Sequence, residues 1–316
     1  MKFVLFNGGN VGLVLDKGIV NLSDKLELLK NLSGQLAMNV LISEITNLKS
    51  EIIEIERSEN LIGMENVTLE APLPSPSKIL CMGGNFTEFG HKKTGSMWGF
   101  LKSSSAIIGP NMSVILPSDD ANIFHHEAEL VLVFGKSGKN VKEEEAFDYI
   151  FGYTCGVDVS ARMPAVSGST VAEFQPWRGI SAPKSYDTFA PIGPVIVTKD
   201  EISDPHNLQI QLSVDGELRG NFNTSDMAHS IAKSIAFVSS FESFQPGDLL
   251  YTGTNHQGLG AMQDGDTINI SIEGVGGFSF DVKDPLKRVW DKGIDQETAK
   301  DVREGTSGPG QRKRPK

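Results

Sequence analysis

Cysteine and long apolar runs are both scarce in this chain. Its 316 residues include only two cysteines, Cys81 and Cys155, and each lies inside an apolar segment. We therefore expect buried free thiols in a reducing cytoplasm rather than a disulfide framework. No apolar run approaches the roughly 18 residues of a membrane-spanning helix, so we expect no such span. The opening MKFVLFNGGN has too short an apolar stretch for a secretory signal and predicts a first strand.

Basic residues are also few relative to acidic ones. The 29 basic residues are outnumbered by 40 acidic ones, which gives a formal net charge of -11. A chain this acidic repels phosphate backbones, so nucleic acid is not an expected partner. The sequence also lacks a G-x-S-x-G elbow, an H-E-x-x-H helix, a Walker loop and a C-x-x-C pair. These absences disfavour a serine hydrolase, a zinc protease and a nucleoside triphosphatase.

The first part of the chain, residues 1–70, predicts a small α/β module. KFVLF and VGLVL flank the glycine-rich turn 7–10, which is typical of a hairpin. Apolar residues then recur at steps of four and three from Leu41 to Ile55, which predicts an amphipathic helix. The proline-punctuated segment 71–78 predicts a linker.

Residues 79–290 consist mainly of short apolar runs bounded by Gly, Pro, Asn or Asp, which predicts a mostly β domain. Hairpins are expected at Asp215-Gly216 and around Gly274, and helices in KEEEAFDYIFG and DMAHSIAKSIAFVSSF. The fold class is therefore α+β with β predominating. Residues 291–316 are polar without periodicity and predict a disordered tail.

The stretch FHHEAEL places two carboxylates at the start of an apolar run. In a strand, Glu127 and Glu129 face the same side. Two carboxylates in a partly buried place need a compensating charge, which a divalent cation would supply. Asp158, in GYTCGVDVSAR, is the best candidate for a third ligand, and such a set favours Mg²⁺, Mn²⁺ or Ca²⁺. The alternative is that Glu127 and Glu129 are only the solvated face of a strand.

Several longer segments together resemble the fumarylacetoacetate hydrolase family: HHEAELVLVFG, EEEAFDYIFGYTCGVDVSAR, KSYDTFAPIGPVIV, VDGELRGNFNTSDM and PGDLLYTGT. They cover about residues 77–283 in the family's order. The resemblance implies a mixed β-sandwich roll, usually homodimeric, that binds Mg²⁺, Mn²⁺ or Ca²⁺ through the residues matching Glu127, Glu129 and Asp158. It also implies a small oxo-acid substrate, whose enolate the metal stabilises as a Lewis acid.

The resemblance assigns roles to further residues. Lys184 matches a lysine close to the metal and is the expected catalytic cation. Lys102 and Thr254 match residues that contact substrate. Arg162 follows the metal aspartate and either binds substrate or forms a structural salt bridge.

The sequence departs from the family in a segment that we call the lid, GGNFTEFGHKK. Hydrolytic members carry a histidine and a glutamate here, at positions that Phe89 and Lys92 occupy in this chain. Glu88 and His91, three residues apart, would share one face of a helical turn and could replace this pair as orienter and base. Otherwise His91 is an exposed lid residue without a role. His256, in YTGTNHQGLG, is the other histidine that could supply acid–base chemistry or bind substrate.

These patterns predict a metal-dependent hydrolase of a C–C bond in an acylpyruvate-like acid. The missing lid histidine favours a decarboxylase, isomerase or lyase with the same metal site, and a metal-holding protein without catalysis is a third alternative. His125 and His126 are expected to have supporting roles. Trp177 and Arg178, in a polar insertion, either line the pocket or seal it.

Overall fold

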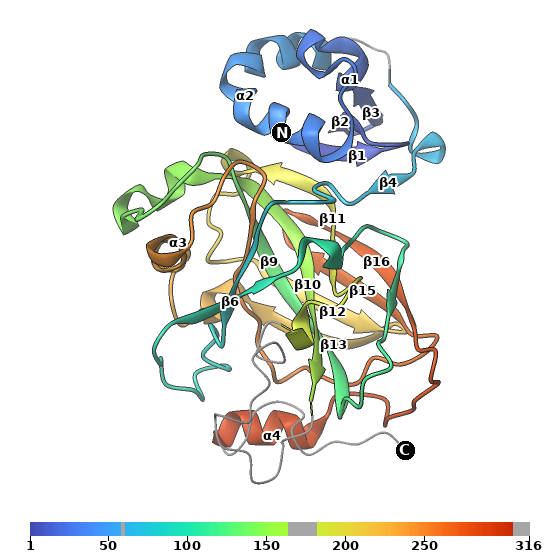
Figure 1. The fold of residues 1–316 in the computed structure, drawn as a ribbon, viewed down its shortest axis with the longest axis vertical. Coiled ribbons are helices and arrows are strands. Elements are labelled where there is room, and N and C mark those ends of the chain that lie inside the picture. The colour runs from blue at the N-terminus through green and yellow to red at the C-terminus, as the bar shows by residue number, and fades with distance from the viewer. Residues whose placement is uncertain (58–60, 164–181, 306–316) are drawn as a thin grey trace.

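The computed structural model describes residues 1–57, 61–163 and 182–305 (Figure 1). Strands predominate over helices, and most belong to two sheets. The predicted α+β class with β predominating is therefore confirmed. The predicted domain boundaries stay a prediction.

The larger sheet has the order β3-β2-β1-β11-β10-β9-β14-β5-β6, with β4 paired to β1 and β7 to β11. Its strands are β1 (Lys2–Phe6), β2 (Asn10–Leu15), β3 (Gly18–Asn21), β4 (Leu69–Glu70), β5 (Ile79–Gly83), β6 (Trp98–Lys102), β7 (Ile107–Ile108), β9 (Ile123–Phe134), β10 (Ile150–Arg162), β11 (Ala190–Thr198) and β14 (Leu249–Tyr251). The longest strands, β9 and β10, are antiparallel neighbours, and nearly all their residues are buried. They form the buried centre of the larger sheet.

The smaller sheet has the order β13-β12-β15-β16-β8. Its strands are β8 (Ser113–Ile115), β12 (Gln209–Val214), β13 (Glu217–Asn223), β15 (Thr267–Ile272) and β16 (Gly276–Lys283). The two predicted hairpins are both present, β12–β13 and β15–β16. Asp215 and Gly216 have φ values of 50° and 82°, as a two-residue turn between twisted strands requires.

The N-terminal strands continue the larger sheet, because β1 pairs with β11. The predicted hairpin joins β1 and β2. The predicted helix is α2 (Gly34–Glu56), with Leu41, Leu48 and Ile52 buried. Two short turns of helix precede it, α1 (Leu22–Lys25) and η1 (Glu27–Leu29). Figure 1 shows these elements at one end of the molecule and α4 at the other.

Two predictions of secondary structure differ from the structure. The acidic segment 142–152 forms only the 3₁₀-helix η4 (Glu143–Tyr149), and strand β10 begins at once at Ile150. The apolar residues from Ile150 onward are buried in strand β10, so they are not available to extend the helix. The predicted disordered tail contains helix α4 (Gln296–Glu304), which buries Ala299 and Val302. Its sequence shows too few apolar residues to reveal a period.

The remaining helix of the prediction is α3 (Ile231–Phe241). Ser230 caps it by accepting a hydrogen bond from the Lys233 backbone N–H. Short 3₁₀ segments complete the described chain: η2 (Met64–Asn66), η3 (Ser104–Ala106), η7 (Ala182–Lys184), η8 (Lys199–Glu201) and η9 (Thr224–Asp226). Within the described residues, no helix is long and apolar enough to cross a membrane.

Candidate metal and catalytic site

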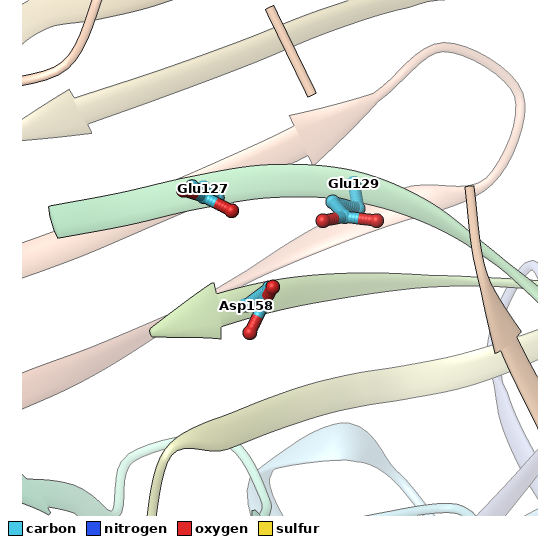
Figure 2. A group of neighbouring side chains, drawn as sticks. All are labelled: Glu127, Glu129 and Asp158. Carbon is cyan, nitrogen blue, oxygen red and sulfur yellow. The ribbon is translucent and has the colours of Figure 1, made fainter. Parts of the chain in front are cut away.

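The central strands bring the acidic residues together. Asp158 on β10 lies directly opposite Glu127 on β9, and Gly156 lies opposite Glu129. The strand alternation turns all three carboxylates to one face, as Figure 2 shows. Each carboxylate is buried, and one oxygen from each lies within 4.8 Å of the others. The alternative of a solvated strand face is therefore wrong.

Three basic side chains surround these carboxylates. Lys184 Nζ donates to Glu127 Oε2 at 2.7 Å, to Ser160 Oγ at 2.7 Å, and to Asp158. Lys102 Nζ donates to Asp158 Oδ1 at 2.5 Å, and Arg162 donates to Glu127. Lys102 is thus buried against a carboxylate in this structure. Arg162 makes the salt bridge that was one of its two predicted roles.

The pKa shifts show that the negative charges of the carboxylates are compensated unevenly. Burial raises the pKa of Glu127, but Lys184 and Arg162 outweigh burial and hold it well below its usual value. Burial raises the pKa of Glu129 well above its usual value, and Asp158 and Glu127 raise it further. Burial lowers the pKa of Lys184, but Asp158 and Glu127 reverse the shift and raise it. Glu129 therefore carries the least compensated charge of the cluster.

The donor set of this cluster fits a hard divalent cation. Three buried carboxylates offer oxygen ligands within a small space, and oxygen ligands suit Mg²⁺, Mn²⁺ or Ca²⁺ better than zinc or copper. Added positive charge would also offset the repulsion at Glu129. Glu127, Glu129 and Asp158 could therefore hold such an ion.

The two histidines of the FHHEAEL stretch lie on opposite faces of β9. His125 shares the Glu127 face, and its Nδ1 accepts a hydrogen bond from Arg162 Nε at 3.1 Å. Burial, with Arg162 and His126, lowers the pKa of His125 well below its usual value. On the other face, burial and Arg219 lower the pKa of His126 to about 3. Both rings are therefore neutral, and His125 supports Arg162.

A cavity of about 310 Å³ opens above the carboxylates. Its walls are Met82, Gly83, Gly84, Glu88, Lys92, Trp98, Phe100, Glu127, Glu129, Arg162, Lys184, Gly253, Thr254, His256, Val302 and Gly305. Thr254 is buried in this wall beside Gly253, whose backbone N–H donates to Glu129 Oε2 at 2.5 Å. The cavity is where a small molecule could reach the acidic cluster.

A buried glutamate holds a histidine at the edge of this cavity. His256 Nδ1 lies 2.6 Å from Glu88 Oε1, and the His256 backbone N–H donates to Glu88 Oε2 at 2.9 Å. Glu88 is completely buried. The other ring nitrogen, His256 Nε2, lies 3.8 Å from Glu127 Oε1. If Nδ1 donates to the carboxylate, Nε2 keeps a free lone pair on the side of the acidic cluster.

The pairing of Glu88 with His91 expected from the sequence is not present. Glu88, Phe89 and Gly90 have φ values of 55°, 59° and 78°, so the lid forms a left-handed turn instead of a helical one. His91 is exposed, while the Glu88 carboxylate turns inward to His256. The structure thus gives Glu88 a histidine partner, but a different one from that predicted.

Asp226 organises both loops of this pair, and the sequence reasoning gave it no role. Its carboxylate accepts from the Thr87 hydroxyl, from the Phe89 backbone N–H at 3.1 Å, and from Asn255 Nδ2 at 2.8 Å. It therefore ties the lid to the loop that carries His256. The only sequence signal was its place in the NTSDM segment.

Replacing Asp226 with alanine should loosen both loops. We expect the free energy of unfolding to fall by about 1–3 kcal/mol, since the half-buried Thr87 hydroxyl and the buried Asn255 amide lose their acceptor. Displacement of His256 should lower turnover by about 10- to 100-fold. Denaturant titration and steady-state kinetics measure the two effects. Asp120→Ala, at an exposed site, is the control; equal behaviour of the two variants would contradict this role.

The C-terminal helix completes the cavity. Val302 and Gly305, at the end of α4, form part of its wall. Arg303 Nη1 donates to Gln257 Oε1 at 3.2 Å, and Gln257 Nε2 donates to the Glu88 carbonyl oxygen at 2.5 Å. The segment expected to be a tail is thus part of the pocket. Trp177 and Arg178 lie outside the described residues.

Comparison with known proteins gives a consistent picture. Residues 78–283 match the family model described as fumarylacetoacetate (FAA) hydrolase C-terminal. The maleylpyruvate hydrolase of Aquipseudomonas alcaligenes is 30% identical over 302 residues, covering 90% of this chain and 99% of that protein. The mitochondrial oxaloacetate tautomerase fahd2 of Xenopus laevis is 36% identical over 236 residues, 71% of each chain.

Solved structures extend the likeness to the fold. The maleylpyruvate hydrolase from Sphingobium sp. SYK-6, in complex with manganese (II) ion and pyruvate, is 33% identical with a TM-score of 0.78. The match covers 90% of this chain and 99% of that one. A 5-carboxymethyl-2-hydroxymuconate delta-isomerase from Mycobacterium smegmatis is 36% identical, with a TM-score of 0.61 over 71% of this chain and 82% of that one. The relatives are hydrolases, tautomerases and isomerases of small acids.

Proposed function

The chain belongs to the fumarylacetoacetate hydrolase family, and on this premise we propose that it is a divalent-metal-dependent hydrolase. Its proposed substrate is an acylpyruvate-like acid such as maleylpyruvate, in which it cleaves a C–C bond. The observation that carries this proposal is the buried Glu88–His256 pair, set with one ring nitrogen toward the acidic cluster. Hydrolysis needs a base that activates water, and this pair has the required form.

Glu127, Glu129 and Asp158 are the proposed ligands of Mg²⁺, Mn²⁺ or Ca²⁺. When bound, the ion supplies Lewis-acid polarisation of the substrate's oxo-acid oxygens. The manganese and pyruvate of the Sphingobium relative support this assignment.

His256 has the geometry of the general base. Glu88 accepts a hydrogen bond from Nδ1–H, and this tautomer leaves Nε2 free to take a proton from water. The water oxygen adds to the acyl carbonyl carbon, and the C–C bond to the pyruvate fragment then breaks. Its electron pair stays on that fragment, which takes a proton to give pyruvate, while the acyl part leaves as a carboxylic acid. Lys184 provides a fixed positive charge beside the acidic cluster.

A tautomerase, isomerase or decarboxylase is the second candidate. The 36% identity with the oxaloacetate tautomerase favours it, and so does Phe89 at the position where hydrolytic members have histidine. The same Glu88–His256 pair would then move a proton between carbon and oxygen without activating water. The two candidates differ in their products.

Product analysis distinguishes these activities. The protein is stripped with EDTA, reloaded with Mg²⁺ or Mn²⁺, and given acetylpyruvate, maleylpyruvate or oxaloacetate in separate reactions. Hydrolysis yields pyruvate plus the acyl acid in equal amounts and stops when EDTA is added. Loss of enol absorbance in oxaloacetate without new products indicates tautomerisation, and CO₂ release indicates decarboxylation; either result without acylpyruvate cleavage would contradict the hydrolase.

Other features stay predictions of the sequence. They are Mg²⁺ as the physiological ion, a homodimer as the assembly, and the cytoplasm as the location.

A further inference from the structure

Strand β6 contributes two alternate residues, Phe100 and Trp98, to the wall of the cavity, and a third, Lys102, lies buried beneath it. Lys102 binds Asp158 at the inner end. Phe100 follows, with its ring centroid 5.0 Å from Lys184 Nζ. Trp98 is last, with 41% of its surface exposed. At about 3.3 Å per residue, the strand runs roughly 13 Å from Lys102 to Trp98. Its outer end is therefore well separated from the acidic cluster.

Lys92 joins Trp98 at this outer end. A Cβ placed on Gly84 would lie 3.1 Å from Lys92 Nζ and 3.3 Å from Trp98 Nε1. Gly84 has a φ of 60° and no side chain, so the ammonium and the indole N–H can both lie against its backbone, close to one another. The only hydrogen bond of Lys92 Nζ in the described structure is a long one, 3.4 Å, to the Gly84 carbonyl oxygen.

The charges in the cavity single out Lys92. Lys184 and Arg162 both pair with Glu127. Lys92 lines the same cavity but has no carboxylate partner among the described residues. An ammonium without a carboxylate partner, beside an indole N–H, presents hydrogen-bond donors that suit an anion, and its one acceptor among the described residues is the distant Gly84 carbonyl oxygen.

We propose that Lys92 and Trp98 form a subsite for a second carboxylate, at the end of the substrate away from the acidic cluster. The inference rests on the proposed function for the orientation of the substrate, with its oxo-acid end at Glu127, Glu129 and Asp158. A 2-oxo acid extended along β6 then directs its other end toward Trp98 and Lys92. The substrate class is a dicarboxylic acylpyruvate, not one with an apolar acyl end.

Binding of unreactive acids tests the subsite without any turnover. The metal-loaded protein is titrated in a calorimeter with 2-oxoheptanedioate, which ends in a carboxylate, and with 2-oxoheptanoate, which ends in a methyl group. We expect the diacid to bind about 10- to 100-fold more tightly, as hydrogen bonds to a charged group imply. Lys92→Met should abolish this preference, Lys92→Arg should retain most of it, and Trp98→Phe should reduce it.

Kinetics supply the second readout. In Lys92→Met, the ratio of kcat/KM for maleylpyruvate to that for acetylpyruvate should fall by about 10- to 100-fold. The control is Lys93→Met, which removes an exposed lysine next in the chain and should leave the ratio unchanged.

The outcomes separate this inference from the proposed function. Equal affinity of the wild-type protein for the two acids, or no detectable binding of the diacid, overturns the subsite. A preference that survives Lys92→Met overturns it as well. Preference for the diacid without cleavage of any acylpyruvate supports the subsite and contradicts the hydrolase.

Discussion

Replacing His256 with glutamine should lower kcat by about 10²- to 10⁴-fold, the range that a positioned acid–base group contributes. The reason is the geometry of the ring, with Nδ1 held by Glu88 at 2.6 Å and Nε2 directed to the acidic cluster. Glutamine keeps the polarity and approximate length of the side chain but cannot take up a proton. Steady-state kinetics with an acylpyruvate measure the effect, and a Mn²⁺ titration should show unchanged metal affinity.

Two further variants make this result specific. Glu88→Gln should lower kcat by at least about 100-fold, because the amide no longer fixes the ring tautomer. His91→Gln, in the same lid but exposed, should retain the wild-type rate. Loss of turnover in His91→Gln with full activity in His256→Gln would restore the lid histidine as the base.

Replacing Glu129 with glutamine should weaken binding of Mg²⁺ or Mn²⁺ by at least about 100-fold, because the charge of the ligand set decides affinity for such ions. Glu129 is the most informative of the three carboxylates. Its hydrogen bond comes from the Gly253 backbone N–H, which glutamine can keep, and it makes no ion pair among the described residues. Calorimetric titration of the EDTA-treated protein measures the affinity.

Asp158→Asn should have an effect of similar size, together with some loss of stability. Its carboxylate is the ion-pair partner of both Lys102 and Lys184. Without it, the positive charges of these two buried lysines are less well compensated. Glu143→Gln, an exposed residue on η4, is the control for a general effect of lost negative charge. Undiminished metal affinity in both Glu129→Gln and Asp158→Asn would show that the ion binds elsewhere.

Local patterns predicted much of this molecule correctly. The step of two between Glu127 and Glu129 fixed their common face, since successive side chains of a strand point to opposite sides. The hairpin at Asp215-Gly216 and the helix from Leu41 to Ile55 followed from turn chemistry and from helical spacing. The motifs identified the family, and the match over residues 78–283 confirms it. Each of these inferences depends on residues close together in the chain.

The partner of Glu88 was decided by the tertiary structure alone. His256 lies 168 residues away in the sequence, and no spacing rule connects the two. Glu88 reaches it because the lid turns left-handed at residues 88–90 and because Asp226 holds both loops. Neither cause is visible in a local period.

The same holds for the walls of the cavity. Val302 reaches the pocket on a helix whose polar sequence predicted no order, and Lys92 meets Trp98 only through the folding of the lid over β6. By itself, the sequence determined the strands, the carboxylates they carry and the family. Which histidine pairs with Glu88 and which lysine lies beside Trp98 was decided by contacts between distant segments, because those contacts depend on sheet pairing and loop packing that short-range periodicity does not encode.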